Sequence, residues 1–211
     1  MKKVVLFLCL LITYGFNVYP QEKMSVNLSA GSSTFREINN SVTQIGNYYT
    51  SIPSYKTGIQ YDFFRQDSVR FFPSFGLDIT VRGAKNNLPD GMVWHGTDKS
   101  YINERFFSVD FPVLLNYKFE DWLIFRGGIN TSLLTGTSNF QGGKEKRLIT
   151  IGLTGGGTIK INKFTINTLY IYDLSNSLTF PNLGISYRSS IFHLGVGYYF
   201  DSFKFKRGFR E

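Results

Sequence analysis

Three features of this sequence contain residue types that could support chemistry. They are two histidines, a run of three glycines and a segment with two aspartates. His95 and His193 are not spaced as ligands of one metal ion, and no nucleophile accompanies them in a catalytic pattern. Glycines 155–157 are not followed by the Gly-Lys-Ser/Thr of a phosphate loop, and their surroundings read as strand. Asp90 and Asp98 lack the spacing of an EF-hand. We therefore predict no enzyme, no cofactor and no metal site.

Ionisable residues of mixed sign occur on the polar faces of the predicted strands. A charge enclosed in a narrow interior needs a partner, because an uncompensated buried charge is costly. We therefore predict a structural polar network in which Asp78, Asp110, Arg82 and Arg126 contact one another. His193 stands between two apolar residues that are predicted to face outward, so its ring should point inward. The full predicted set is Asp62, Asp78, Arg82, Asp110, Arg126 and His193.

Apolar and polar residues alternate in segment after segment, which is typical of β-strands with one apolar face. Between residues 107 and 119 every odd position is apolar or aromatic, whereas the even positions include Ser108, Asp110 and Asn116. Eight such segments are present, at residues 24–30, 55–63, 71–82, 107–119, 123–133, 149–159, 164–173 and 192–200. The pattern predicts an all-β protein, an eight-stranded antiparallel up-and-down β-barrel.

The links between these segments alternate in length. Tight turns are expected near residues 66–67, 120–121 and 162, whereas the links at about 32–54, 83–104, 135–146 and 174–189 are long. Transmembrane barrels of the outer membrane have short periplasmic turns and long external loops. Both mature termini would then lie on the periplasmic side.

A soluble lipocalin-like barrel is the main rival, because it shows the same alternation with its apolar face inward. In mid-strand the polar face is mostly Gly, Ser, Thr and Asn, whereas the outside of a soluble barrel should be rich in Lys and Glu. We therefore favour a transmembrane barrel in which the apolar face meets lipid. Aromatic residues near the strand ends are expected to form an interfacial girdle, namely Tyr117, Phe119, Trp122, Phe164, Tyr198, Tyr199 and Phe200.

The two ends of the chain differ from its middle. Residues 1–20 resemble a secretory signal peptide, because Lys2 and Lys3 precede an apolar run at 4–12 that is too short to span a bilayer. Cys9, the one cysteine, lies in this segment. Cleavage near residue 21 would reduce the formal charge from +8 to +6 by removing the two lysines. Residues 21–205 would then form the barrel, and residues 206–211 a basic tail.

The basic C-terminal end offers positive charge next to phenylalanines. We predict that it contacts a periplasmic partner or the inner headgroup layer, through Lys204, Lys206, Arg207 and Arg210. The alternative is that the last strand continues to residue 205 and then frays. An exported chain rarely meets nucleic acid, so we expect no nucleic-acid partner.

Residues 107–136 carry a family resemblance. The run Val-Asp-Phe-Pro-Val-Leu-Leu at 109–115 leads through Asn116, Tyr117 and Lys118 to the pair Gly127 and Gly128. With the glycine-rich stretch 152–157 and the closing strand 194–200, this part resembles the outer-membrane β-barrel family of the PorT type, common in Bacteroidota. The resemblance covers about half the chain, which departs from the family by continuing eleven residues beyond Phe200. It implies a fold and an outer-membrane location; a few members assist protein secretion.

A barrel of eight strands has an interior just wide enough for its own side chains. We therefore expect a structural or interaction role, as a subunit of a larger outer-membrane assembly or secretion machinery. The expected partners are outer-membrane lipid and other outer-membrane or periplasmic proteins. The alternative is a narrow conduit or a small-ligand-binding barrel.

Overall fold

The regular structure of this protein is entirely β in the computed structural model, which describes residues 23–37, 48–63, 69–87, 93, 100–138, 145–180 and 185–200. Eight long strands make up the wall: β1 (Lys23–Glu37), β3 (Ile52–Asp62), β4 (Phe71–Asn87), β5 (Tyr101–Glu120), β6 (Leu123–Ser138), β8 (Ile149–Ile161), β9 (Phe164–Asp173) and β11 (Ile185–Phe200). Three short strands, β2 (Tyr48–Thr50), β7 (Glu145–Lys146) and β10 (Leu178–Phe180), pair beside them. Among the described residues no helix is long and apolar enough to cross a membrane.

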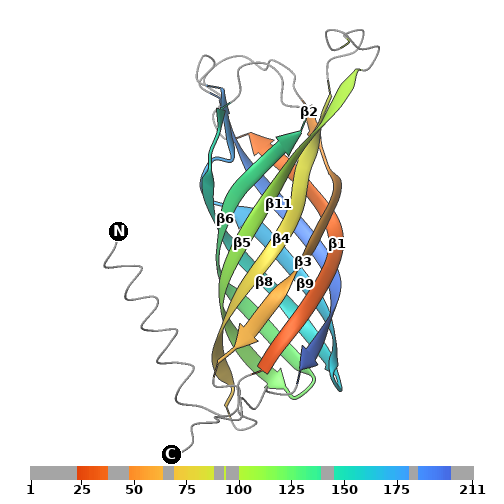
Figure 1. The fold of residues 1–211 in the computed structure, drawn as a ribbon, viewed down its shortest axis with the longest axis vertical. Helices are drawn as coiled ribbons and strands as arrows, with labels where there is room; N and C mark the ends of the chain where they lie inside the picture. The colour runs from red at the N-terminus through yellow and green to blue at the C-terminus, as the bar shows by residue number, and fades with distance from the viewer. Residues whose placement is uncertain are drawn as a thin grey trace, which may run out of the picture.

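The long strands form a closed ring of eight (Figure 1). Each pairs antiparallel with its neighbours in chain order, and β1 closes the ring by pairing with β11 from Met24 opposite Phe200 to Glu37 opposite Tyr187. The predicted eight-stranded antiparallel up-and-down barrel is therefore confirmed. Closure leaves no unpaired edge among the long strands, which a barrel in lipid requires.

The strands continue beyond the segments in which hydrophobicity alternates. β4 ends at Asn87 and β5 begins at Tyr101, so the long link predicted at 83–104 is shorter than expected. The two strands stay in register there, with Lys85 opposite Asn103. The outward side chains in this part are polar or charged, so the pairing continues where the apolar signal has ended. β1 and β11 extend into their predicted links in the same way.

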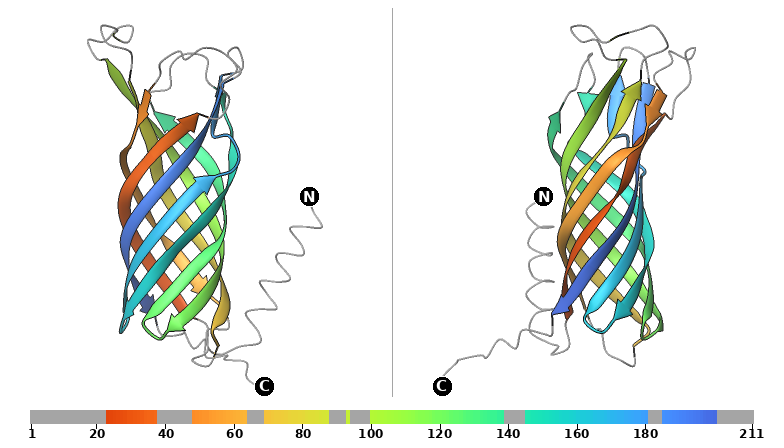
Figure 2. Two further views of the ribbon diagram at one scale, coloured as in Figure 1. Left: turned by 180° about the vertical axis from the view of Figure 1, so that it is seen from behind. Right: turned by 90° about the vertical axis from the view of Figure 1, so that its right-hand side faces the viewer.

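The short turns lie together at one end of the barrel, where β1 also begins and β11 ends (Figures 1 and 2). β8 and β9 are joined by Asn162 and Lys163, and Asn162 has a φ of 57°. Asn tolerates this left-handed backbone better than most residues, which suits a two-residue hairpin. The predicted turns near 120 and 162 are confirmed, whereas the one at 66–67 lies outside the described residues.

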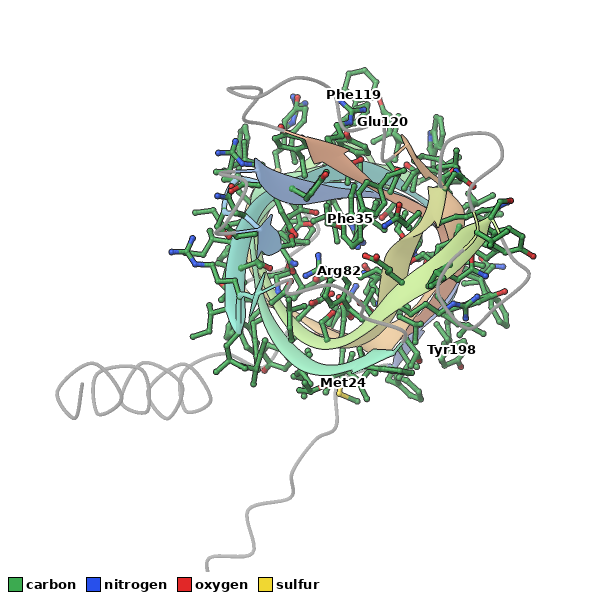
Figure 3. The ribbon with its side chains drawn as sticks, turned by 90° about the horizontal axis from the view of Figure 1, so that it is seen from above. Met24, Phe35, Arg82, Phe119, Glu120 and Tyr198 are labelled. Atoms are coloured by element: carbon green, nitrogen blue, oxygen red, sulfur yellow. The ribbon has the colours of Figure 1, made fainter. Side chains whose placement is uncertain are left out.

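The two faces of the wall differ in chemistry, as the view along the barrel shows (Figure 3). Outward apolar side chains remain well exposed, with Phe71 at 60% and Val113 at 55%. Inward side chains are mostly small, polar and buried, and Ser54, Thr80 and Asn116 have no exposed surface. The soluble-barrel alternative, with its apolar face inward, is therefore wrong for this chain.

The outward apolar residues form a continuous band around the barrel. On β4 the band runs from Phe71 to Val81, ten residues apart. With a rise of about 3.3 Å per residue and a tilt of about 40°, this corresponds to a height of roughly 25 Å, the height of the lipid-facing band in outer-membrane barrels.

Aromatic pairs mark the short-turn edge of this band, as predicted. Phe71 stacks beside Tyr117 at 4.8 Å between ring centroids, and Phe164 lies 5.3 Å from Tyr198. Tyr199 does not belong to this girdle, contrary to the prediction, because it points into the lumen and is 4% exposed. Its neighbours Tyr198 and Phe200 take the outward positions that the pleat allows.

Candidate functional site

The lumen of the barrel contains the six ionisable residues that the sequence singled out. Each occupies an inward position of its strand because successive side chains alternate between the two faces. Asp78 on β4 lies directly opposite Asp110 on β5. Five of the six are buried, and Arg126 on β6 is half-buried.

Arg82 forms the most deeply buried ion pair of the described lumen, with Asp173 at the end of β9. Arg82 Nη1 lies 3.1 and 3.3 Å from the two carboxylate oxygens of Asp173, and both side chains are 1% exposed. Arg82 Nη2 also donates to Thr150 Oγ1 at 3.2 Å, and Ser177 Oγ donates to Asp173 at 2.9 Å. This cross-lumen contact satisfies both charges and joins strands from opposite parts of the chain.

The two opposed aspartates have different partners. Asp78 accepts from Lys56 Nζ on the neighbouring strand β3, at 3.0 Å. Asp110 accepts from Thr80 Oγ1 at 2.6 Å, and its other oxygen has no hydrogen-bond partner among the described residues. Neither aspartate forms an ion pair with Arg82 in the described structure.

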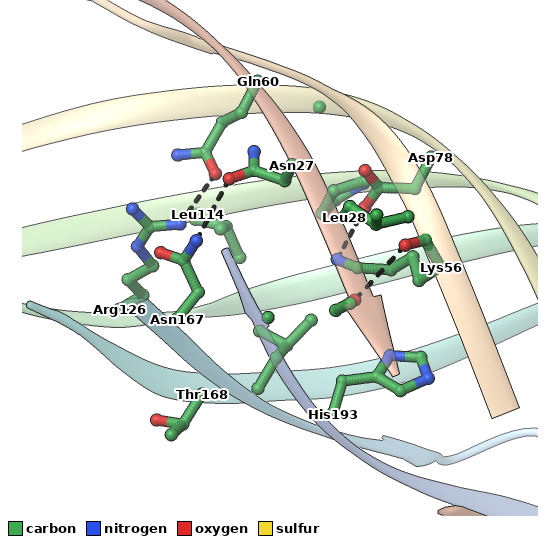
Figure 4. A pocket seen from close by; sticks show the side chains of 15 residues that line it. Asn27, Leu28, Lys56, Gln60, Asp78, Leu114, Arg126, Asn167, Thr168 and His193 are labelled. Carbon is green, nitrogen blue, oxygen red and sulfur yellow. Dashed lines mark hydrogen bonds and ion pairs between the residues drawn. The ribbon is translucent and has the colours of Figure 1, made fainter. Parts of the chain in front are cut away.

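Arg126 and Asp62 are linked near the short-turn end through two neutral side chains, Gln60 and Tyr199. Figure 4 shows the contact between Arg126 and Gln60. Arg126 donates to Gln60 Oε1 at 2.8 Å and to the Tyr199 hydroxyl at 3.4 Å. Gln60 Nε2 in turn donates to Asp62 at 2.8 Å, and the Tyr199 hydroxyl donates to its other oxygen at 3.1 Å. The expected direct contacts among Asp78, Asp110, Arg82 and Arg126 are thus replaced by contacts with other lumen residues.

His193 on β11 lies against Ser54 on β3, with Nε2 2.8 Å from the Ser54 hydroxyl oxygen. The same hydroxyl donates to the Val81 carbonyl at 2.8 Å. A serine hydroxyl has one proton and a carbonyl only accepts, so the proton of the first contact must come from Nε2. His193 is 1% exposed, and its contact with Ser54 is compatible with a structural position in the wall. Its Nδ1 has no hydrogen-bond partner among the described residues.

An apolar cluster closes the lumen at the long-link end. Its buried members are Phe35, Ala84, Phe106, Leu134 and Tyr187, and Tyr49 packs against them from the short strand β2. The Tyr49 ring lies 4.8 Å from that of Tyr187 and 5.3 Å from that of Phe35, in edge-on contacts.

The sequence analysis did not identify this apolar cluster. Phe106 has the inward parity of its strand but lies one residue before the segment assigned as alternating, and Tyr49 falls within a predicted link. The available signal was inward parity, which Phe106 shares with Leu134, one residue beyond the segment 123–133.

A small cavity remains in the polar part of the lumen (Figure 4). It measures about 40 Å³ and is lined among others by Lys56, Gln60, Arg126, Asn167 and His193. A water molecule needs at least roughly 10–15 Å³, so the cavity has room for a few waters and not for a substrate. Among the described residues, no group of three or more His, Cys, Asp or Glu side chains is placed to hold a metal ion. His95, Asp90 and Asp98 lie outside the described residues.

The closed ring, the apolar band and the filled polar lumen together define the class: a small β-barrel of the outer-membrane type. OprG, an outer-membrane protein of Pseudomonas aeruginosa, is similar with a TM-score of 0.52 and 11% sequence identity, over 86% of this chain and 97% of that chain. Ail, the attachment invasion locus protein of Yersinia pestis, solved in complex with the heparin analogue sucrose octasulfate, gives 0.50 and 14%, over 85% and 99%. No protein-family model matches the sequence, and no curated protein matches it. At this level of sequence identity, the similarity to OprG and Ail is a similarity of fold.

Proposed function

We propose that this protein is a non-conducting barrel of the bacterial outer membrane that acts as an interaction scaffold, as a subunit of a larger assembly. The observation that carries the proposal is the filled lumen. The apolar cluster around Phe35 lies at one end, the Arg82–Asp173 ion pair follows beneath it, and the cavity beside Lys56 and His193 measures about 40 Å³. Diffusion of nutrients needs an open channel, which barrels of this size do not leave.

The outer-membrane location is supported by the exterior. The apolar band of roughly 25 Å matches a bilayer core, and a membrane is the solvent in which such a surface is stable. Because β1 begins and β11 ends among the short turns, we place both mature termini in the periplasm. The signal peptide at 1–20 and the contacts of the basic C-terminal end belong to this proposal and lie outside the described residues, the latter being those of Lys204, Lys206, Arg207 and Arg210.

An interaction role is supported by a patch of outward glycines in the band, which we call the glycine patch. Gly127 on β6 lies opposite Gly155 on β8, and Gly157 follows on the same face. A Cβ on Gly127 would have no atom within 4 Å, and on Gly155 its nearest contact would be 3.8 Å away. Packing within the barrel therefore does not require these glycines. Missing side chains let another backbone approach closely, as small residues do where transmembrane helices pack in lipid.

The resemblance of residues 107–136 to PorT-type barrels belongs to the same proposal. Some members of that family assist secretion, and a scaffold role is compatible with such a machinery. The run at 109–115 lies on β5, whose Pro112 faces the lumen and contributes to the wall of the cavity.

Planar-bilayer recording of the purified full chain tests the closed lumen. We expect no discrete conductance steps in the native protein. We expect none in Tyr49→Ala either, because the Arg82–Asp173 pair still fills the lumen beneath the missing ring. Regular steps in the native protein would contradict the proposal.

The second candidate is a gated conduit, which one observation favours. Tyr49 closes the lumen from a strand of only three residues at the long-link end, so it is held by fewer backbone contacts than the wall. A conduit of this kind predicts steps in Tyr49→Ala and none in the native protein. The same recording therefore separates the two candidates.

Co-purification in mild detergent tests the scaffold role. Gly127→Leu with Gly157→Leu fills the glycine patch without touching the lumen, and Thr131→Leu adds apolar bulk elsewhere on the outward face of β6. We expect proteins that co-purify with the native chain to be lost from the glycine variant and kept by the threonine variant. Retention of every partner by both variants would remove the glycine patch from the proposal.

A further inference from the structure

Two arginines face each other across the closing seam of the barrel, at the long-link end. The register of β1 and β11 places Arg36 directly opposite Arg188, both on the outward face. Arg36 is exposed and Arg188 is half-buried. Lys85 on β4 and Arg105 on β5 lie on the outward face at the same end. We call Arg36 and Arg188 the seam arginines.

Like charges placed directly opposite on neighbouring strands destabilise a sheet. Among the described residues no carboxylate lies within 4.0 Å of either seam guanidinium. Arg188 Nε has one neutral contact, with Asn176 Oδ1 at 3.4 Å. In the lumen, by contrast, Lys56 and Arg82 each pair with an aspartate. The seam thus brings two cations together, and the described residues supply no counter-charge there.

The seam arginines lie just beyond the edge of the apolar band. Toward the long-link end, the outward apolar residues of β11 stop at Phe192, which is 49% exposed. Arg188 lies four residues further toward that end. Four residues of a tilted strand correspond to a distance of about 10 Å along the barrel axis. In a membrane this depth is that of the lipid headgroups and their phosphates. Arg105 lies closer to the band, two residues beyond Phe107, which corresponds to about 5 Å along the barrel axis.

We propose that the seam arginines bind a phosphate group of an anionic lipid in the outer leaflet. The guanidinium fork presents paired N–H donors that match phosphate oxygens, and a shared phosphate would convert the repulsion between the two arginines into attraction to a common anion. Lys85 is a weaker contributor, because its Nζ already lies 3.9 Å from the centroid of the Tyr101 ring. The lipid is the source we commit to, since the seam arginines face outward at headgroup depth. This inference rests on the proposed outer-membrane placement.

The test is a titration of fluorescent lipid A that carries both phosphates, into the full chain in uncharged maltoside micelles, followed by anisotropy. An arginine near an anionic lipid surface contributes roughly a factor of five in binding, so Arg36→Gln with Arg188→Gln should raise Kd about 25-fold. Arg36→Lys with Arg188→Lys keeps the charges and should lose less. Arg70→Gln with Lys163→Gln removes two charges at the short-turn end and should leave Kd unchanged.

Two further titrations identify the ligand chemistry. Dephosphorylated lipid A should bind no better to the native protein than to the double glutamine variant. Inorganic phosphate at the same concentration should not compete, and effective competition would assign the site to a soluble anion instead. An unchanged Kd in the double glutamine variant would overturn the inference. Heat-modifiable migration on gels reports barrel folding separately, so failure of the native, correctly folded barrel to bind lipid A would count against this inference and not against the proposed function.

Discussion

The ion pair between Arg82 and Asp173 is the residue-scale feature on which the closed lumen depends most. Removing one partner leaves the other charge buried and unpaired, which costs about 3–5 kcal/mol. We expect Arg82→Met and Asp173→Asn each to reduce the free energy of unfolding by that amount. The double variant Arg82→Met with Asp173→Leu should lose much less than the sum, because no lone charge remains. Urea titration of the barrel in lipid vesicles measures all three.

The ion pair of Lys118 and Asp121, in which the aspartate is exposed and the lysine is 12% exposed, supplies the control. Asp121 is 92% exposed, and exposed pairs contribute about 0–1 kcal/mol. Asp121→Asn should therefore be nearly neutral. If Arg82→Met reduced the free energy of unfolding as little as Asp121→Asn does, the buried pair of Arg82 and Asp173 would not stabilise the barrel.

The sequence predicted which residues face the lumen but not which residues pair there. Asp62, Asp78, Arg82, Asp110 and His193 are all inward and buried, because strand parity decides the face and parity is readable from alternation. The partner of Arg82 lies 91 residues away on the opposite wall. Such a contact depends on the register and stagger of β4 and β9, which are not neighbours in the barrel. The alternation within each strand contains no information on this register.

At the scale of elements, adjacent glycines of β8 have opposite roles. A Cβ on Gly156 would overlap the Thr168 carbonyl oxygen of the neighbouring strand, whereas on Gly155 its nearest neighbour would be the Arg126 carbonyl oxygen at 3.8 Å. We expect Gly156→Ala to destabilise the barrel by about 1–3 kcal/mol, in the range of overpacking. Gly155→Ala should be neutral or slightly stabilising, since alanine restricts the unfolded chain more than glycine.

Unfolding of the two alanine variants under the same conditions makes this comparison internal to one strand. Equal losses in both would mean that neither the crowding at Gly156 nor the open space at Gly155 determines the outcome. Of the three glycines at 155–157, Gly156 is the one at which the structure shows crowding.

Strand order and number were predictable from alternation, whereas strand length was not. Alternation of hydrophobicity records the contrast between lipid and lumen, so it ends at the edge of the apolar band. Backbone pairing depends on hydrogen bonds that continue past that edge, as Lys85 opposite Asn103 shows. The apolar cluster of the lumen was missed for the related reason that Tyr49 comes from a strand too short to show a period.

At the scale of the whole molecule, the distribution of polarity is the reverse of that in a soluble protein. Apolar side chains such as Leu115 and Val196 cover the outside, and charged pairs fill the inside. The proposed scaffold role, the glycine patch and the seam arginines all assume that lipid surrounds this exterior. The placement of the apolar band in a bilayer is therefore the central claim.

Spin-label accessibility on β5 tests this claim most directly. Two single-cysteine variants are made in a Cys9→Ser background, so that each has one thiol on the outward face of β5. Leu115→Cys places it inside the apolar band, and Arg105→Cys places it outside the band. In barrels folded into phosphatidylcholine vesicles, we predict that the label at 115 collides with dissolved oxygen and is shielded from a water-soluble nickel chelate. The label at 105 should be accessible to the chelate. A label at 115 as accessible to the nickel chelate as the one at 105, in a folded barrel, would contradict the account.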